Sequence, residues 1–273
     1  MTNHPKNCWK QKLEEDNFLS EKEVEYCDAI LKGFDLRRIN HIGCLVNKVR
    51  HRINKQNKEN EALFELRLAT EFVEDAKNIE YEHQSINGSK VDFYCEYKGM
   101  KWFIEAVSVR KSSCYSNEEN ELIRLQRIIG KKVYDNKNKK FIKFGEPEAN
   151  NVNMIIVDAR GFNMGTMDND DFREALFERT IEPQNRHFVN KKPLKGIFKS
   201  LSEDELNAVK PIQQRVHYIV FVHEKFNTSY ELESSLVHKA QPGNMFHGCY
   251  IARNEKLLGK EQDVFPFKGV SSG

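Results

Sequence analysis

Three short runs of almost unbroken apolar residues constrain the fold of this chain most strongly. They comprise Trp102–Val109, Val152–Asp158 and Val216–Val222, and the third is rich in both β-branched and aromatic side chains. Runs of this length and composition are typical of strands that are covered on both faces. A helical pattern at Glu118–Tyr134 separates the first two runs. This alternation predicts an α/β fold in which helices flank both faces of a mixed central β-sheet.

A helix followed by a β-meander is predicted before the second run. Apolar residues recur at three- and four-residue spacing over 57–75, as on one face of a helix. Three extended segments follow, at Glu80–Gln84, Lys90–Tyr97 and Lys101–Val109. Turn signals that contain Gly88 and Gly99 separate them, so consecutive segments are expected to pair as hairpins.

The predicted organisation is an N-terminal helical segment at 1–56, an α/β domain at 57–260 with an insertion at about 161–211, and a tail at 261–273. Ser20 and Glu23 form a capping-box pattern at the start of a helical segment that runs to about residue 57. The insertion is rich in charged and turn residues. Helices are predicted within it at Asp170–Arg179 and Glu203–Val209, and a last short strand at Gly248–Arg253.

Composition and charge exclude several classes of protein. Lys and Arg total 43 against 41 Asp and Glu, so contact with a polyanion must come from local patches. No apolar run approaches the ~18 residues of a membrane helix, and the first residues hold no apolar stretch for a signal peptide. A cytoplasmic protein without a membrane partner is expected. The six cysteines lack zinc-type spacing, and neither a phosphate-binding P-loop nor a G-x-S-x-G motif occurs.

A carboxylate inside an apolar strand needs a partner, because burying an unpaired charge is costly. Glu105 interrupts the first apolar run, and Asp92 lies on the preceding segment, across the turn near Gly99. The two carboxylates are therefore expected on neighbouring strands, where a divalent cation would relieve their repulsion. Oxygen ligands favour magnesium, and Glu65 on the preceding helix is placed to add a third carboxylate. A buried ion pair with a lysine or arginine is the structural alternative for Glu105.

This arrangement resembles the PD-(D/E)XK nuclease superfamily over about 61–158. The core of that family is a helix, a β-meander, a crossover helix and a further strand. Phe64–Ala69 resembles its first helix with the Glu, Val91–Phe93 the strand with the metal-binding Asp, and Phe103–Val107 the E-x-K strand. The resemblance implies a restriction-endonuclease-like core and a Mg²⁺ ion, with Mn²⁺ as a substitute. It implies these site residues: Asp92, Glu105 and Glu65 as metal ligands and catalytic groups, with a lysine beside them.

The sequence departs from the family pattern where the strand lysine is expected, because Val107 stands there. Some branches of the superfamily carry this lysine on the following helix. Lys131 and Lys132 are the candidates at that place, and Arg110 and Lys111 just after the strand are the other options.

Clusters of basic residues offer contacts to phosphate groups. Six lysines occur between 131 and 143, and further basic residues occur near residue 50 and in the insertion. The residues expected to contact nucleic acid are Arg50, Arg52, Lys137, Lys139, Lys140, Lys191 and Lys192. Ordinary solvated lysines are the alternative for each cluster.

Together these patterns predict a magnesium-dependent endonuclease that hydrolyses phosphodiester bonds of DNA, with RNA as an alternative substrate. The resemblance implies restriction, phage defence or mobile-element biology, and a homodimer or a partner subunit is an open expectation. Two alternatives remain. A nucleic-acid-binding or scaffold protein that keeps the fold without catalysis agrees with Val107. A purely protein-binding module predicts no salt-dependent affinity for DNA.

Overall fold

The computed structural model of the chain describes residues 36–52, 59–73, 76–85, 88–109, 118–135, 137–159, 169–179, 194–198, 210–222 and 249–258. The helix predicted at Glu203–Val209 and the segment from Ser20 to residue 35 lie outside the described residues. In the described part of the chain, no helix is both long enough and apolar enough to cross a membrane.

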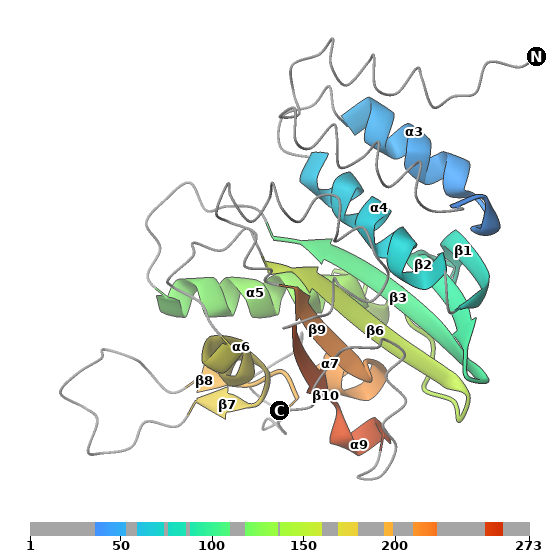
Figure 1. The fold of residues 1–273 in the computed structure, drawn as a ribbon. Helices are drawn as coiled ribbons and strands as arrows, with labels where there is room; N and C mark the ends of the chain where they lie inside the picture. Colours follow the sequence, from blue (N-terminus) through green and yellow to red (C-terminus); the bar gives the residue numbers. More distant parts are fainter. Residues whose placement is uncertain are drawn as a thin grey trace, which may run out of the picture.

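The centre of the molecule is a mixed sheet of six strands, as the sequence predicts (Figure 1). In spatial order the strands are β1 (Lys77–Gln84), β2 (Lys90–Tyr97), β3 (Met100–Ser108), β6 (Asn151–Asp158), β9 (Tyr218–Val222) and β10 (Tyr250–Arg253). The first three form an antiparallel meander, β6 and β9 continue the sheet in parallel with β3, and β10 closes it antiparallel to β9.

The β2–β3 hairpin fixes the register on which the candidate site depends. Lys98 and Gly99 both have positive φ, of 49° and 79°, as a tight two-residue hairpin turn requires. The turn aligns Tyr97 with Met100, and the pairing continues in step to Phe93 and Ile104. Beyond this last pair, the side chain of Asp92 takes over the contact between the strands, because its Oδ2 accepts a hydrogen bond of 2.8 Å from the backbone N–H of Ala106.

Helices cover both faces of the sheet, as predicted. On one side lie α3 (Ile42–Arg52) and α4 (Glu59–Val73), and on the other lie α5 (Glu118–Val133), α6 (Asn169–Leu176) and α7 (Lys210–Arg215) (Figure 1). The helices predicted at 57–75 and 118–134 are confirmed. Among the described residues, the other helical elements are η1 (Leu36–Arg38) and α9 (Glu255–Leu258).

The predicted N-terminal helix is interrupted in its described part. Between η1 and α3 the chain pairs with strand β1 instead, because Asn40 donates to the carbonyl of Ile79 at 2.8 Å and accepts from the N–H of Tyr81 at 2.9 Å. His41 follows with a φ of 62°, which ends the extended stretch and starts α3. Backbone pairing with a strand edge thus outweighs local helical propensity here.

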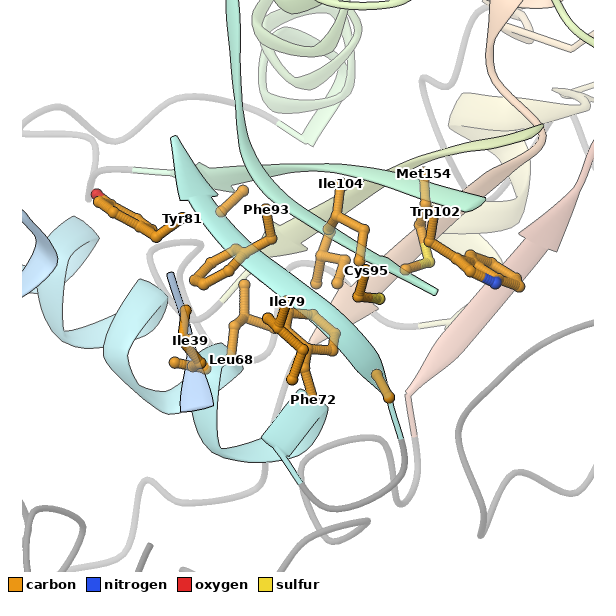
Figure 2. Packing of buried hydrophobic residues seen from close by; sticks show 14 of the residues in the cluster. Ile39, Leu68, Phe72, Ile79, Tyr81, Phe93, Cys95, Trp102, Ile104 and Met154 are labelled. Carbon is orange, nitrogen blue, oxygen red and sulfur yellow. The ribbon is translucent and has the colours of Figure 1, made fainter. Parts of the chain in front are cut away.

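The first core cluster fills the space between the sheet and α3 and α4. Phe93 packs edge-on against Phe72 at 5.2 Å and against Tyr81 at 5.3 Å, between ring centroids. Figure 2 shows Tyr81 at one end of this cluster, with its hydroxyl oxygen directed away from the apolar side chains. That hydroxyl group is the point at which the core borders the candidate site.

The second core cluster lies between the sheet and α5, α6 and α7. The described part of the predicted insertion contributes to it, because Phe172, Ile197 and Phe198 are buried there. The helix predicted at Asp170–Arg179 is too long. It ends at Leu176, whose carbonyl accepts from the N–H of Phe198 at 2.6 Å, and the chain continues into two short paired strands, β7 (Glu178–Arg179) and β8 (Leu194–Lys195).

Substitutions in β6 test whether both faces of the sheet are covered. Ile155 belongs to the second core cluster and Ile156 to the first, and neither side chain is exposed. Ile155→Ala and Ile156→Ala are each expected to lower the free energy of unfolding by about 2–5 kcal/mol in urea titrations. Lys101→Ala, at an exposed position of β3, should change it by less than about 0.5 kcal/mol. A large effect at only one isoleucine contradicts the two-sided arrangement.

Candidate active site

Asp92 and Glu105 lie on the neighbouring strands β2 and β3, where the β2–β3 hairpin opens away from its turn. Asp92 Oδ2 accepts a hydrogen bond of 2.8 Å from the backbone N–H of Ala106. Glu105 is fully buried. The hydrogen bond to Ala106 thus places the side chain of Asp92 beside the backbone of β3, one residue after Glu105.

Two lysines from different elements approach the Glu105 carboxylate. Lys132, in the last turn of α5, donates to Oε1 at 2.8 Å, and its Nζ lies 3.5 Å from the carbonyl oxygen of Ala106. Lys143 places its Nζ 3.1 Å from Oε2. That contact is an ion pair by distance, but its angles lie outside hydrogen-bond geometry, so Oε2 has a cation beside it and no hydrogen-bond donor. The ion pair considered as the structural alternative for Glu105 is therefore present.

Glu65 projects from α4 with a lysine and a tyrosine as partners. Its side chain is buried, and Lys48 of α3 places its Nζ 2.5 Å from each carboxylate oxygen. The hydroxyl group of Tyr81 on β1 donates to Oε2 at 2.6 Å. We call Glu65, Asp92 and Glu105 the carboxylate cluster.

Electrostatics link the members of the carboxylate cluster. Burial, and after it the charge of Asp92, raise the pKa of Glu65 and of Glu105, and against the opposing effect of the lysines the result is about 7 for each. Asp92 is thus close enough to act on both glutamates. For Lys132, burial lowers the pKa, but Glu105 and Asp92 outweigh it and bring the value to about 12. Its ammonium group therefore remains charged at neutral pH.

The structure distinguishes between the candidate lysines. Lys132 contacts Glu105, whereas Lys131 is exposed on α5. Val107, at the position of the family's strand lysine, is buried in the second core cluster. Arg110 and Lys111 lie outside the described residues.

Sequence reasoning missed Lys143 as a site residue and missed the hairpin that positions it. Strand β4 (Tyr134–Asp135) follows α5 directly and pairs with β5 (Lys140–Phe141). The sequence signal for this hairpin is Asp135, since aspartate is a common turn residue. In the structure its carboxylate accepts from the backbone N–H groups of Lys137 and Asn138 at 2.9 and 3.2 Å. In the sequence, Lys143 is distinguished only as the last of the six lysines between 131 and 143.

Part of the predicted nucleic-acid contact surface is described. Lys137, Lys139 and Lys140 are exposed on the β4–β5 hairpin, and Lys143 lies on the loop that follows β5. Arg50 and Arg52 lie on α3, but their side chains are outside the described set, as are Lys191 and Lys192 altogether.

The donor set of the carboxylate cluster fits a hard divalent cation in chemistry, because it offers carboxylate oxygens from facing strands. Within the described residues, however, no group of three or more Asp, Glu, His or Cys side chains is arranged to hold a metal ion. Ammonium groups lie against the oxygens of Glu65 and Glu105. A cation that binds Glu105 must therefore displace an ammonium group.

Comparisons with protein-family models, with curated proteins and with solved structures found no match to this chain. The function must therefore be inferred from the chemistry of the carboxylate cluster and its lysines.

The raised pKa values predict how stability depends on pH. The carboxyl group of Glu105 has a pKa near 4.5 when unfolded and about 7 when folded, so the folded state binds more protons between these values. Its contribution to stability is complete below about pH 4.5 and is lost as the pH rises through 7. Between about pH 5 and 8, the wild type should lose on the order of 1–3 kcal/mol more unfolding free energy than Glu105→Gln.

Urea unfolding over this pH range measures the difference. Glu146→Gln is the matched control, because the Glu146 side chain is 84% exposed. Its pH profile should run parallel to that of the wild type. Parallel profiles for Glu105→Gln as well would contradict the raised pKa.

Proposed function

We propose that this protein is a metal-dependent nuclease of the PD-(D/E)XK type that hydrolyses phosphodiester bonds of DNA. The observation that carries the proposal is the contact between Lys132 and Glu105, at 2.8 Å. In the proposal, Lys132 on α5 takes the role of the family's strand lysine, because Val107 stands at the strand position. The element order α4, β1, β2, β3, α5 and β6 also supports the proposal, since a restriction-endonuclease-like core has this order.

In this proposal Asp92 and Glu105 hold a Mg²⁺ ion, or Mn²⁺ in its place. When bound, the metal supplies charge stabilisation at the phosphate and lowers the pKa of a coordinated water. Lys132 keeps a positive charge beside Glu105, where it can stabilise a developing oxyanion or orient a water. Glu65, buried between Lys48 and Tyr81, contributes a third negative charge to the same site.

The β4–β5 hairpin is the proposed contact to the nucleic acid backbone. Lys137, Lys139 and Lys140 are exposed on it, and the loop that follows reaches Glu105 through Lys143. Phosphate groups bound at the hairpin would therefore lie near the carboxylate cluster. Contacts of this kind are sequence-independent and position the substrate.

A second candidate function is nucleic-acid binding without catalysis. The ammonium groups of Lys48, Lys132 and Lys143 against Glu65 and Glu105 favour it, because these pairs already stabilise the carboxylates without a metal. Both candidates require the hairpin lysines, and only the nuclease requires cleavage.

Cleavage of supercoiled plasmid in the presence of magnesium tests the nuclease. Asp92→Asn and Glu105→Gln should each lower the rate by more than about 100-fold, because each removes a charged ligand. Lys132→Met should lower it by about 100-fold through loss of the fixed positive charge. Lys131→Met should have at most about a threefold effect, because its side chain is exposed and has no contact with Glu105 among the interactions described.

Lys101→Met is the matched control for these variants, since Lys101 is exposed on β3 at the far end of the hairpin. Circular dichroism checks that each variant is folded. Wild-type rates in both Asp92→Asn and Glu105→Gln exclude the proposed site. Absence of cleavage by a wild type that still binds DNA supports the second candidate.

The salt dependence of DNA binding tests the hairpin. In EDTA, where hydrolysis is prevented, the logarithm of the affinity for a short duplex should fall linearly with the logarithm of the salt concentration. The triple variant Lys137→Gln, Lys139→Gln, Lys140→Gln should lower the slope by about 2–3 in fluorescence anisotropy titrations. An unchanged slope would place the phosphate contacts elsewhere.

A further inference from the structure

The loop that carries Lys143 holds a backbone geometry that is rare outside functional sites. The N–H of Phe144 donates to the carbonyl of Ile142 at 2.8 Å, which closes a γ-turn around Lys143, whose φ is 69°. A γ-turn with positive φ at a non-glycine residue is strained. This strain persists because the turn is anchored on both sides: Phe144 is buried, and the N–H of Lys143 donates to Ser89 Oγ at 2.7 Å.

The two lysines at Glu105 are held differently. Lys132 makes a hydrogen bond to Oε1 and also faces the carbonyl of Ala106. Lys143 has an ion pair of 3.1 Å to Oε2 without hydrogen-bond geometry. Its backbone is fixed by the anchored turn, so its flexible side chain alone can leave Oε2. Lys143 is therefore the ammonium group that a cation displaces more easily.

We infer that Lys143 is a gatekeeper of the cation site: its ammonium group occupies the place of a divalent cation at Glu105 Oε2 and must swing away before the cation binds. This inference rests on the proposed function and specifies how its site is regulated. The displaced ammonium group stays next to the hairpin that carries Lys137, Lys139 and Lys140, where it can pair with phosphate. Substrate that binds the hairpin would thereby favour release of Lys143 and entry of the cation.

The test measures binding of Mn²⁺ alone, without nucleic acid, to the full chain by electron paramagnetic resonance of the free ion. Lys143→Gln removes the competing positive charge and should tighten Mn²⁺ binding by about tenfold or more. Lys143→Arg keeps the charge and should bind Mn²⁺ with an affinity within about twofold of the wild type. Lys101→Gln, at an exposed position of β3, controls for the general change in net charge and should behave as the wild type. Thermal unfolding confirms that each variant is folded.

An affinity for Lys143→Gln that is unchanged or weaker overturns the inference, as does equal tightening by Lys101→Gln. Glu105→Gln, made alone and together with Lys143→Gln, separates this result from the proposed function. If Glu105→Gln weakens Mn²⁺ binding while Lys143→Gln changes nothing, only the gatekeeper role fails. If Mn²⁺ binds equally well without the Glu105 carboxylate, the cation site of the proposed nuclease fails as well.

Discussion

The burial of Glu105 in the middle of a covered strand is the constraint on which the rest of the site depends. A carboxylate without solvent must be neutralised by protons, ammonium groups or metal ions. The chain uses Lys132 and Lys143, which come from the end of α5 and from the loop after β5. The point at which α5 ends and the position of the loop after β5 thus both determine whether Glu105 has its lysine partners.

The position of the cluster follows from the layers around the sheet. Strand β3 lies beside β2 on one side and β6 on the other, while α4 and α5 cover opposite faces. Asp92, on the neighbouring strand β2, is near enough to raise the pKa of both Glu65 and Glu105. The open end of the β2–β3 hairpin is therefore where charges from the two layers meet.

Local patterns are sufficient for the strands and for the pairing of β2 with β3 from Tyr97 to Phe93, because a tight turn fixes the register of a hairpin. They do not predict that the Asp92 side chain accepts from the backbone of Ala106 beyond this paired stretch. They did not choose between Lys131 and Lys132, since the rotation of α5 depends on how it packs against the sheet. The contact of Lys143 with Glu105 cannot be predicted from local patterns for a similar reason. Its place depends on the short β4–β5 hairpin and on a contact with Ser89, 54 residues earlier, which no local pattern encodes.

In the proposed nuclease, charge balance would link the binding of a cation to the binding of a phosphate group. When all three carboxyl groups of Glu65, Asp92 and Glu105 are ionised, they are matched in number by the ammonium groups of Lys48, Lys132 and Lys143. A divalent ion added to this set leaves two excess positive charges in a region of low dielectric, which is unfavourable. Release of one ammonium group and arrival of one phosphate would together remove this excess. The same lysines that stabilise the buried carboxylates in the absence of ligand would thus couple cation binding to substrate binding.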